Sequence, residues 1–234
     1  MLYALAHPAA LLVLVVSFVV GVGLHGWVGA AVAFAVRDRR PRLSGRLTPD
    51  PRPHLEPFGV LAGAISGLGW SKPIDLPDRR RRAAVVLVAL SGPLANIAIG
   101  IGLLALVRVA HGGPGRGLAA TFFSPSFLLQ HGLSLTGAAG VTGATALYLA
   151  GCSQLYLGAL SLVPLPPLDG GRLLFALGPR THGWQQAEYQ LVERNFGVAA
   201  LLVLLVVPLG GGQTLLPRLL DIVLAPLVTG VAGG

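Results

Sequence analysis

Long runs of apolar residues, separated by short polar connections, dominate this chain. The first run extends from Ala9 to Val36 and is interrupted only by Ser17, His25 and Trp27. At 1.5 Å per residue, a helix of this length is about 42 Å long, which exceeds the roughly 30 Å hydrocarbon core of a bilayer. The run therefore predicts a tilted membrane-spanning helix that projects about a turn beyond the membrane.

Further apolar runs predict membrane segments of different lengths, at Ala83–Val109, Thr136–Val163, Phe196–Leu209 and Leu215–Val231. The last two are short and separated by glycines, so they fit either one hairpin or two partial helices. Leu55–Trp70 is apolar but glycine-rich and too short for a span, which favours a re-entrant or interfacial element. The predicted fold is all-α: one domain over residues 1–234, forming a bundle of about five or six membrane segments with a short re-entrant element.

Composition and charge agree with a membrane protein. Hydrophobic residues make up 53% of the chain and charged residues only 11%, a balance typical of helical membrane proteins. The net charge is +8, and eleven of the seventeen basic residues lie between Arg37 and Arg82. If Leu55–Trp70 dips into the membrane and returns, these residues share one side, as the positive-inside rule requires of cytoplasmic loops. Nucleic acid is not an expected partner, because no aromatic residues or nucleic-acid-binding fold accompany the charges.

Asp169 is the most informative polar residue, because it follows a long run without charge and a stretch rich in proline. An ionisable side chain is costly to bury in a membrane and is therefore a functional candidate. On a rigid turn its carboxylate suits a metal ligand, and it suits equally the cap of a helix that runs from Gly171. His25 is a candidate partner, since imidazole is the commonest zinc ligand, although a lone histidine on an apolar helix is more often a packing residue.

Several short motifs occur in a fixed order along most of the chain. After Arg37-Asp38 they are Ser44-Gly45-Arg46-Leu47-Thr48-Pro49, Pro53-His54-Leu55-Glu56-Pro57-Phe58-Gly59, Gly69-Trp70-Ser71-Lys72-Pro73-Ile74, Ala89-Leu90-Ser91-Gly92-Pro93-Leu94-Ala95-Asn96 and Ser161-Leu162-Val163-Pro164-Leu165-Pro166-Pro167-Leu168-Asp169-Gly170-Gly171-Arg172. Together they resemble the bacterial branch of the site-2-type intramembrane zinc metalloproteases. The resemblance implies a multi-pass protein of the bacterial inner membrane, zinc as a cofactor, and cleavage of peptide bonds within or near the membrane.

The resemblance also implies roles for individual positions. In that family the first long helix carries His-Glu-x-x-His: both histidines bind zinc, the glutamate is the general base, and the aspartate of the Asp-Gly motif is the third ligand. Here His25 matches the first histidine and Asp169 the third ligand. Gly26 stands at the position of the base and Gly29 at that of the second histidine, while Ser161 replaces an asparagine that helps to position substrate or oxyanion. We therefore expect two residual metal positions, no catalytic base, and weak or absent zinc binding.

Other residues could rebuild such a site, and this leaves two functions open. His54 and Cys152 are candidate ligands and Glu56 a candidate base, although His54 matches a histidine that the family carries at its re-entrant segment. The first function is a pseudoprotease, which is catalytically inactive but binds membrane-embedded segments of a client or pairs with an active relative. The alternative is an active intramembrane zinc metalloprotease with a non-standard site. A small transporter ranks last, because inverted repeats and several intramembrane charges are not found in the sequence.

Overall fold

The computed structural model describes residues 8–110, 125–126, 129, 142–207 and 214–232. Within these ranges the regular secondary structure is helical, apart from isolated β-bridge positions such as the pair Leu55 and Ser71. The all-α fold expected from the sequence is therefore confirmed.

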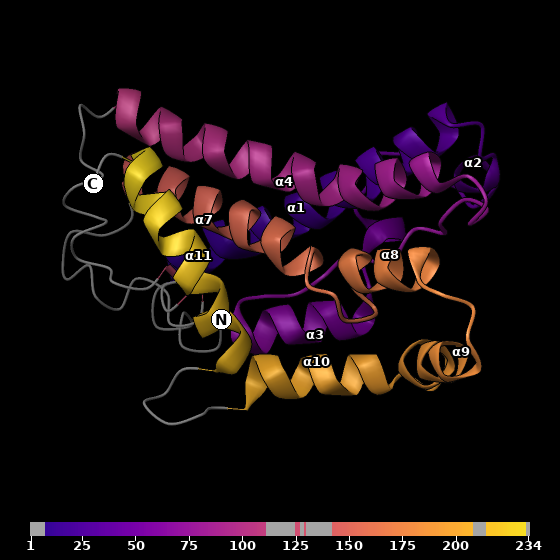
Figure 1. Cartoon of the computed structure of the whole chain (residues 1–234). Helices are drawn as coiled ribbons and strands as arrows, with labels where there is room; N and C mark the ends of the chain where they lie inside the picture. Colours follow the sequence, from indigo (N-terminus) through magenta and orange to yellow (C-terminus); the bar gives the residue numbers. More distant parts are fainter. Residues whose placement is uncertain (1–7, 111–124, 127–128, 130–141, 208–213, 233–234) are drawn as a thin grey trace.

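Three long helices form the centre of the bundle: α1 (Pro8–Ala35), α4 (Arg82–Ala110) and α7 (Gly143–Ser161). α4 packs along α7, and α1 packs against both of them (Figure 1). Small residues let membrane helices approach closely. Gly158 is such a residue, because a Cβ there would lie 2.6 Å from the carbonyl oxygen of Pro93.

Two buried amide side chains join these helices. Asn96 of α4 donates a hydrogen bond to the carbonyl oxygen of Gly21 at 3.3 Å, and Gln154 of α7 donates to that of Ser17 at 2.7 Å. Polar side chains between membrane helices commonly bond across the interface in this way. Ser17, Gly21 and His25 are four residues apart and therefore share one helical face. The two bonds thus fix the rotation of α1 so that His25 faces the bundle interior, where it is buried.

Three short helices lie between α1 and α4: α2 (Arg40–Leu43), the 3-10 helix η2 (Arg52–His54) and α3 (Pro57–Ser66). α3 ends at Gly67, whose φ of 79° is the left-handed conformation that glycine adopts at helix C-termini. The chain then returns, since Leu55 pairs with Ser71 and the Lys72 N–H donates to the His54 carbonyl oxygen at 2.7 Å. The two ends of the α3 segment therefore meet, as expected of an element that dips and returns.

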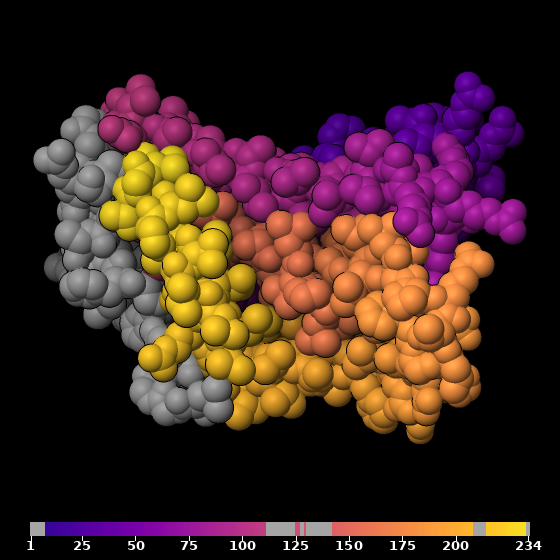
Figure 2. Space-filling model, viewed as in Figure 1, coloured from indigo at the N-terminus to yellow at the C-terminus, as the bar shows by residue number. Residues whose placement is uncertain are grey.

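The C-terminal part contains five helical segments: α8 (Asp169–Leu177), α9 (His182–Glu188), the π-helical turn η4 (Tyr189–Glu193), α10 (Phe196–Val206) and α11 (Leu215–Ala232). α8 packs against α4, and α10 packs against α3. α11 packs against α4 and α7 at the end of the bundle away from α9 (Figures 1 and 2). The His25 face of α1 is thus enclosed by α4, α7 and α8.

Three helices of the described ranges are long and apolar enough to cross a membrane, namely α1, α4 and α11. α9–η4 together with α10 would make a fourth, but its two parts are bent by 64°. The expected count of five or six spans is therefore not confirmed. α7, which the sequence predicted as a span, is not among the three. Most of its residues are buried between neighbouring helices, so it can carry polar residues such as Gln154 that lower its hydropathy.

Candidate functional site

The structure brings His25 and Asp169 together, although 144 residues separate them in sequence. Nε2 of His25 lies 2.8 Å from Oδ2 of Asp169. Asp169 is the first residue of α8, and Leu168 is the N-cap. The alternative in which Asp169 caps this helix is therefore wrong. Its carboxylate still lies in the first turn, where the helix dipole favours negative charge.

A tightly packed turn positions Asp169. α7 ends at Ser161, and the peptide bond between Pro166 and Pro167 is cis. A Cβ built at Gly171 would lie 2.6 Å from Cδ of Pro166. Only glycine permits so close an approach of backbone, so α8 can begin directly against the proline turn.

Gly26, the position matched to the general base, faces the ring of His54. A Cβ built at Gly26 would lie 2.6 Å from Cγ and 2.9 Å from Cβ of His54, and closer still to its Nδ1. His54 is fully buried, so its ring fills the volume that a side chain at position 26 would need. Nε2 of His54 lies 3.0 Å from the Thr48 carbonyl oxygen. That bond places the ring proton on Nε2 and leaves Nδ1 with a lone pair beside Gly26. Burial lowers the pKa of His54, which favours this neutral ring.

Gly29, the position matched to the second zinc-binding histidine, faces Ile74. A Cβ at Gly29 would lie 3.2 Å from Cδ1 of Ile74. Beside His25, a Cβ at Gly92 would lie 2.7 Å from Nε2 of the imidazole. The absence of a side chain at Gly92 therefore leaves space for this ring. A cavity of about 10 Å³ remains among these residues and Asp169. Such a volume is about what one water molecule needs.

The other sequence candidates lie elsewhere. Ser161 donates its hydroxyl hydrogen to the carbonyl oxygen of Leu157 at 2.9 Å, within its own helix. Cys152 is buried in the hydrophobic core. Glu56 accepts a hydrogen bond from the Gly59 N–H and caps α3. None of these three candidates lines the cavity beside His25.

The residues present do not fit a catalytic zinc ion. Such an ion takes three protein ligands and keeps one open position. One ion could contact both Nε2 of His25 and Oδ2 of Asp169, but the described residues contain no group of three or more His, Cys, Asp or Glu side chains placed to hold a metal. The second nitrogen of a ligating histidine almost always donates to a partner. Nδ1 of His25 is buried and has no such partner in the described ranges.

Three arginines to which the sequence analysis gave no structural role hold the extended segment 72–76 that covers the cavity. Their donors reach four carbonyl oxygens of this segment: Arg46 those of Lys72 (2.7 Å) and Pro73 (2.6 Å), Arg172 that of Ile74, and Arg40 that of Leu76 (2.8 Å). Burial lowers the pKa of Arg46 and Arg172, but a guanidinium stays charged in proteins. The Gly-Arg and Asp-Gly-x-Arg motifs could have indicated this role, because each places an arginine beside a turn.

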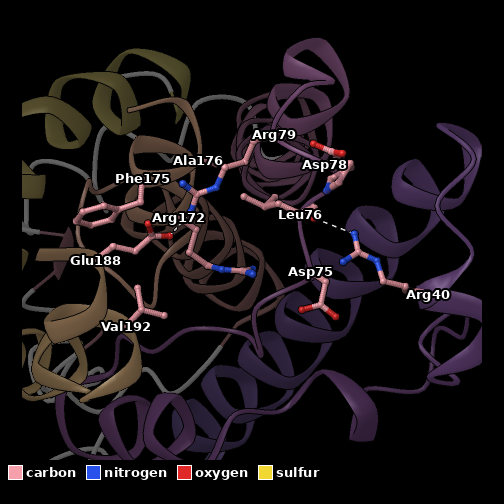
Figure 3. Close-up of a pocket in the computed structure, with 11 residues that line it drawn as sticks. Arg40, Asp75, Leu76, Asp78, Arg79, Arg172, Phe175, Ala176, Glu188 and Val192 are labelled. Carbon is pink, nitrogen blue, oxygen red and sulfur yellow. Dashed lines mark hydrogen bonds and ion pairs between the residues drawn. The ribbon is translucent and has the colours of Figure 1, made fainter. Parts of the chain in front are cut away.

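Two larger cavities adjoin this segment. One, of about 530 Å³, contains the Arg172 guanidinium between the Arg79–Glu188 ion pair and the side chains of Asp75 and Arg40 (Figure 3). The other, of about 310 Å³, has a mainly apolar lining beside the turn that carries Asp169, with these apolar residues: Phe58, Pro73, Pro166, Pro167, Leu191, Val192 and Val198. Arg172 lines both cavities, together with Asp75 and Val192.

Comparison with known proteins places this chain in a family. The model of Peptidase family M50 matches residues 11–204. The Bacillus subtilis (strain 168) protein named "Putative zinc metalloprotease YwhC" is 32% identical over 211 residues, which are 88% of this chain and 86% of that protein. No solved structure matches the chain. The family match includes His25, Asp169 and every motif described above, and on this evidence the chain belongs to peptidase family M50, the site-2 protease family.

Proposed function

We propose that this chain is a catalytically inactive site-2 protease homologue that binds membrane-embedded segments of other proteins. One observation carries the proposal: the positions of the base and the second ligand are Gly26 and Gly29, and the side chains of His54 and Ile74 lie against them. A positioned acid–base group alone contributes about 10²–10⁴-fold to a rate. The remaining cavity of about 10 Å³ is too small for a peptide group.

A binding role needs a surface outside the filled centre. The 310 Å³ cavity offers apolar walls together with the polar groups of Glu56 and Arg172, a combination that suits the end of a membrane-embedded segment. We place this cavity near the cytoplasmic face of a bacterial inner membrane, because the basic residues from Arg37 to Arg82 lie on adjoining loops.

Reconstitution tests both halves of the proposal. Purified full-length chain is placed in liposomes with single-span model peptides, with added zinc or with chelator, and cleavage is followed by mass spectrometry. We expect no cleavage in either condition. A photo-crosslinking residue at Phe58, in the 310 Å³ cavity, should trap the peptide, whereas one at Val109 should not. Val109 is a fair control because it is also exposed but lies at the far end of α4. Chelator-sensitive cleavage, or equal trapping from both positions, would refute the proposal.

The alternative, an active enzyme with a non-standard site, is favoured by one feature. Nδ1 of His54 carries a lone pair beside Gly26 and has no hydrogen-bond partner among the residues described. Such a nitrogen could act as a base. This function requires that cleavage be measurable and that His54→Ala abolish it. Glu56→Gln should leave it largely intact, because Glu56 is engaged as the cap of α3.

A further inference from the structure

The contact between His25 and Asp169 joins two helices that carry other restraints of their own. α1 is fixed by the amide bonds from Asn96 and Gln154. α8 is fixed through Arg172, whose guanidinium donates to the Ile74 carbonyl oxygen. The Ile74 side chain in turn packs against Gly29 of α1. His25 and Asp169 therefore close a ring of contacts through α1, α8 and the segment 72–76.

We infer that His25 and Asp169 form a metal-independent joint that locks α8 onto α1, so that the residues at the two remaining ligand positions serve the fold. The inference concerns the site of the proposed function but does not depend on client binding.

The hydrogen-bonding capacity of the imidazole supports this role. In the joint, Nε2–H donates to Oδ2 of Asp169, and Nδ1 is left as an acceptor. If Nε2 instead bound a metal, the ring proton would sit on Nδ1, which is buried with no partner within the described part of the chain. Buried donors without an acceptor are rarer in proteins than buried acceptors without a donor. The surroundings of His25 therefore suit a ring that donates from Nε2 better than a ring that ligates through it.

The packing around the pair also favours direct contact. Gly92 is so close to Nε2 of His25 that a single added Cβ would lie 2.7 Å away. Ile74 lies against Gly29, where the next ligand would have to project. His25 and Asp169 therefore lie in a space that suits a direct hydrogen bond, and within the described ranges no further His, Cys, Asp or Glu side chain joins them to hold an ion.

Metal analysis and a double-mutant cycle test the joint. The full-length chain is purified in detergent after growth with added zinc, its zinc content is measured, and its unfolding midpoint is compared with and without chelator. The same midpoints are measured for His25→Ala, Asp169→Ala and their combination. We expect far less than one zinc per chain and no effect of chelator on the unfolding midpoint. The double variant should be no less stable than the less stable of the two single variants, because either change breaks the same bond.

Asp169→Asn separates the two roles further. An asparagine oxygen still accepts from Nε2–H, so the joint predicts a smaller loss of stability than Asp169→Ala causes. An amide is a poor substitute for a zinc-binding carboxylate, so a metal site predicts that zinc and its stabilisation are lost with either variant. Ser161→Ala is the matched control, since Ser161 is buried but bonded within its own helix, and it should add independently to His25→Ala.

The outcomes distinguish this inference from the proposed function. One zinc per chain that Asp169→Asn removes, or additive losses from His25→Ala and Asp169→Ala, would overturn the joint even if no peptide is cleaved. Cleavage by a zinc-free chain would overturn the inactive role and leave the joint standing.

Discussion

Gly26→Glu restores the residue that the family uses as its base, and the structure predicts that this protein tolerates it poorly. The Cβ alone would lie 2.6 Å from Cγ of His54, a ring that is fully buried and held through Nε2 by the Thr48 carbonyl oxygen. Overpacking of a well-packed interior costs about 1–3 kcal/mol. A buried carboxylate that lacks partners adds a further penalty, so we expect a loss of at least about 3 kcal/mol.

Graded variants isolate the steric part of this loss. Gly26→Ala adds only the Cβ and should already destabilise the chain by about 1–3 kcal/mol. Gly102→Ala is its control, because Gly102 also lies in a long helix but has no atom within 4 Å of a built Cβ. That control should be neutral or stabilising by up to about 1 kcal/mol, since alanine has the higher helix propensity.

His54→Ala should relieve the clash. The stability losses of Gly26→Glu and His54→Ala should be less than additive in the double variant, with a coupling of about 0.5–3 kcal/mol as found for residues in contact. Thermal unfolding of the purified chain in detergent measures all these differences; about 3 kcal/mol corresponds to roughly 6–12 °C for a chain of this size. If Gly26→Ala behaves like Gly102→Ala, or if the two changes add independently, His54 does not fill the position of the base.

Three further predictions concern neighbouring residues. Gly92→Ala should destabilise the chain by about 1–3 kcal/mol, because its Cβ would lie 2.7 Å from Nε2 of His25; the loss should shrink in the background of His25→Ala, and equal losses would contradict the contact. Burial lowers the folded-state pKa of His54, so the unfolded chain binds the proton more readily and stability should fall as pH decreases below about 6.5. Unfolding midpoints measured between neutral pH and pH of about 5 should depend less on pH for His54→Gln than for the original chain. An unchanged pH dependence would show that His54 is not its source. Arg172→Lys loses the planar guanidinium that reaches the Ile74 carbonyl oxygen, so amide hydrogen exchange in the segment 72–76 should accelerate, while unchanged exchange would show that this bond does not hold the segment.

The long helices could be predicted closely from the apolar pattern. The runs Ala9–Val36 and Ala83–Val109 became helices Pro8–Ala35 and Arg82–Ala110, because charged or proline-bearing segments follow the first run and precede the second. The glycine-rich run Leu55–Trp70 is too short for a span, which predicted a re-entrant element; the structure shows that the two ends of this segment meet. α7 was harder to interpret. A helix enclosed by protein does not need the uniform apolar surface that lipid requires, and Gln154 in its middle shows this.

The pairing of His25 with Asp169 could be predicted from the sequence motifs, whereas the packing around Gly26 and Gly29 could not. The motifs identified His25 and Asp169 as partners, and the structure places their atoms 2.8 Å apart. The same motifs could not show that His54 and Ile74 lie against the two glycines, because that depends on how the segment between α1 and α4 folds back over α1. The capping alternative for Asp169 failed by a single residue, since the N-cap is Leu168, and helix boundaries are uncertain by that much from sequence.

In the proposed inactive homologue, this packing connects the loss of catalysis with the retention of the fold. A missing base would leave a hole if nothing moved into its place, and an unfilled cavity destabilises a protein in proportion to its volume. Here the imidazole of His54 and the side chain of Ile74 lie where added side chains would project, and only about 10 Å³ remains. Under the proposed inactive role, the filled centre needs no metal for its stability, and that stability opposes the gain of a hydrolytic site. Glu at position 26 and His at position 29 would place both new side chains against volume that His54 and Ile74 occupy. Neither side chain can therefore take up a catalytic position unless the side chains at positions 54 and 74 move or are replaced by smaller ones.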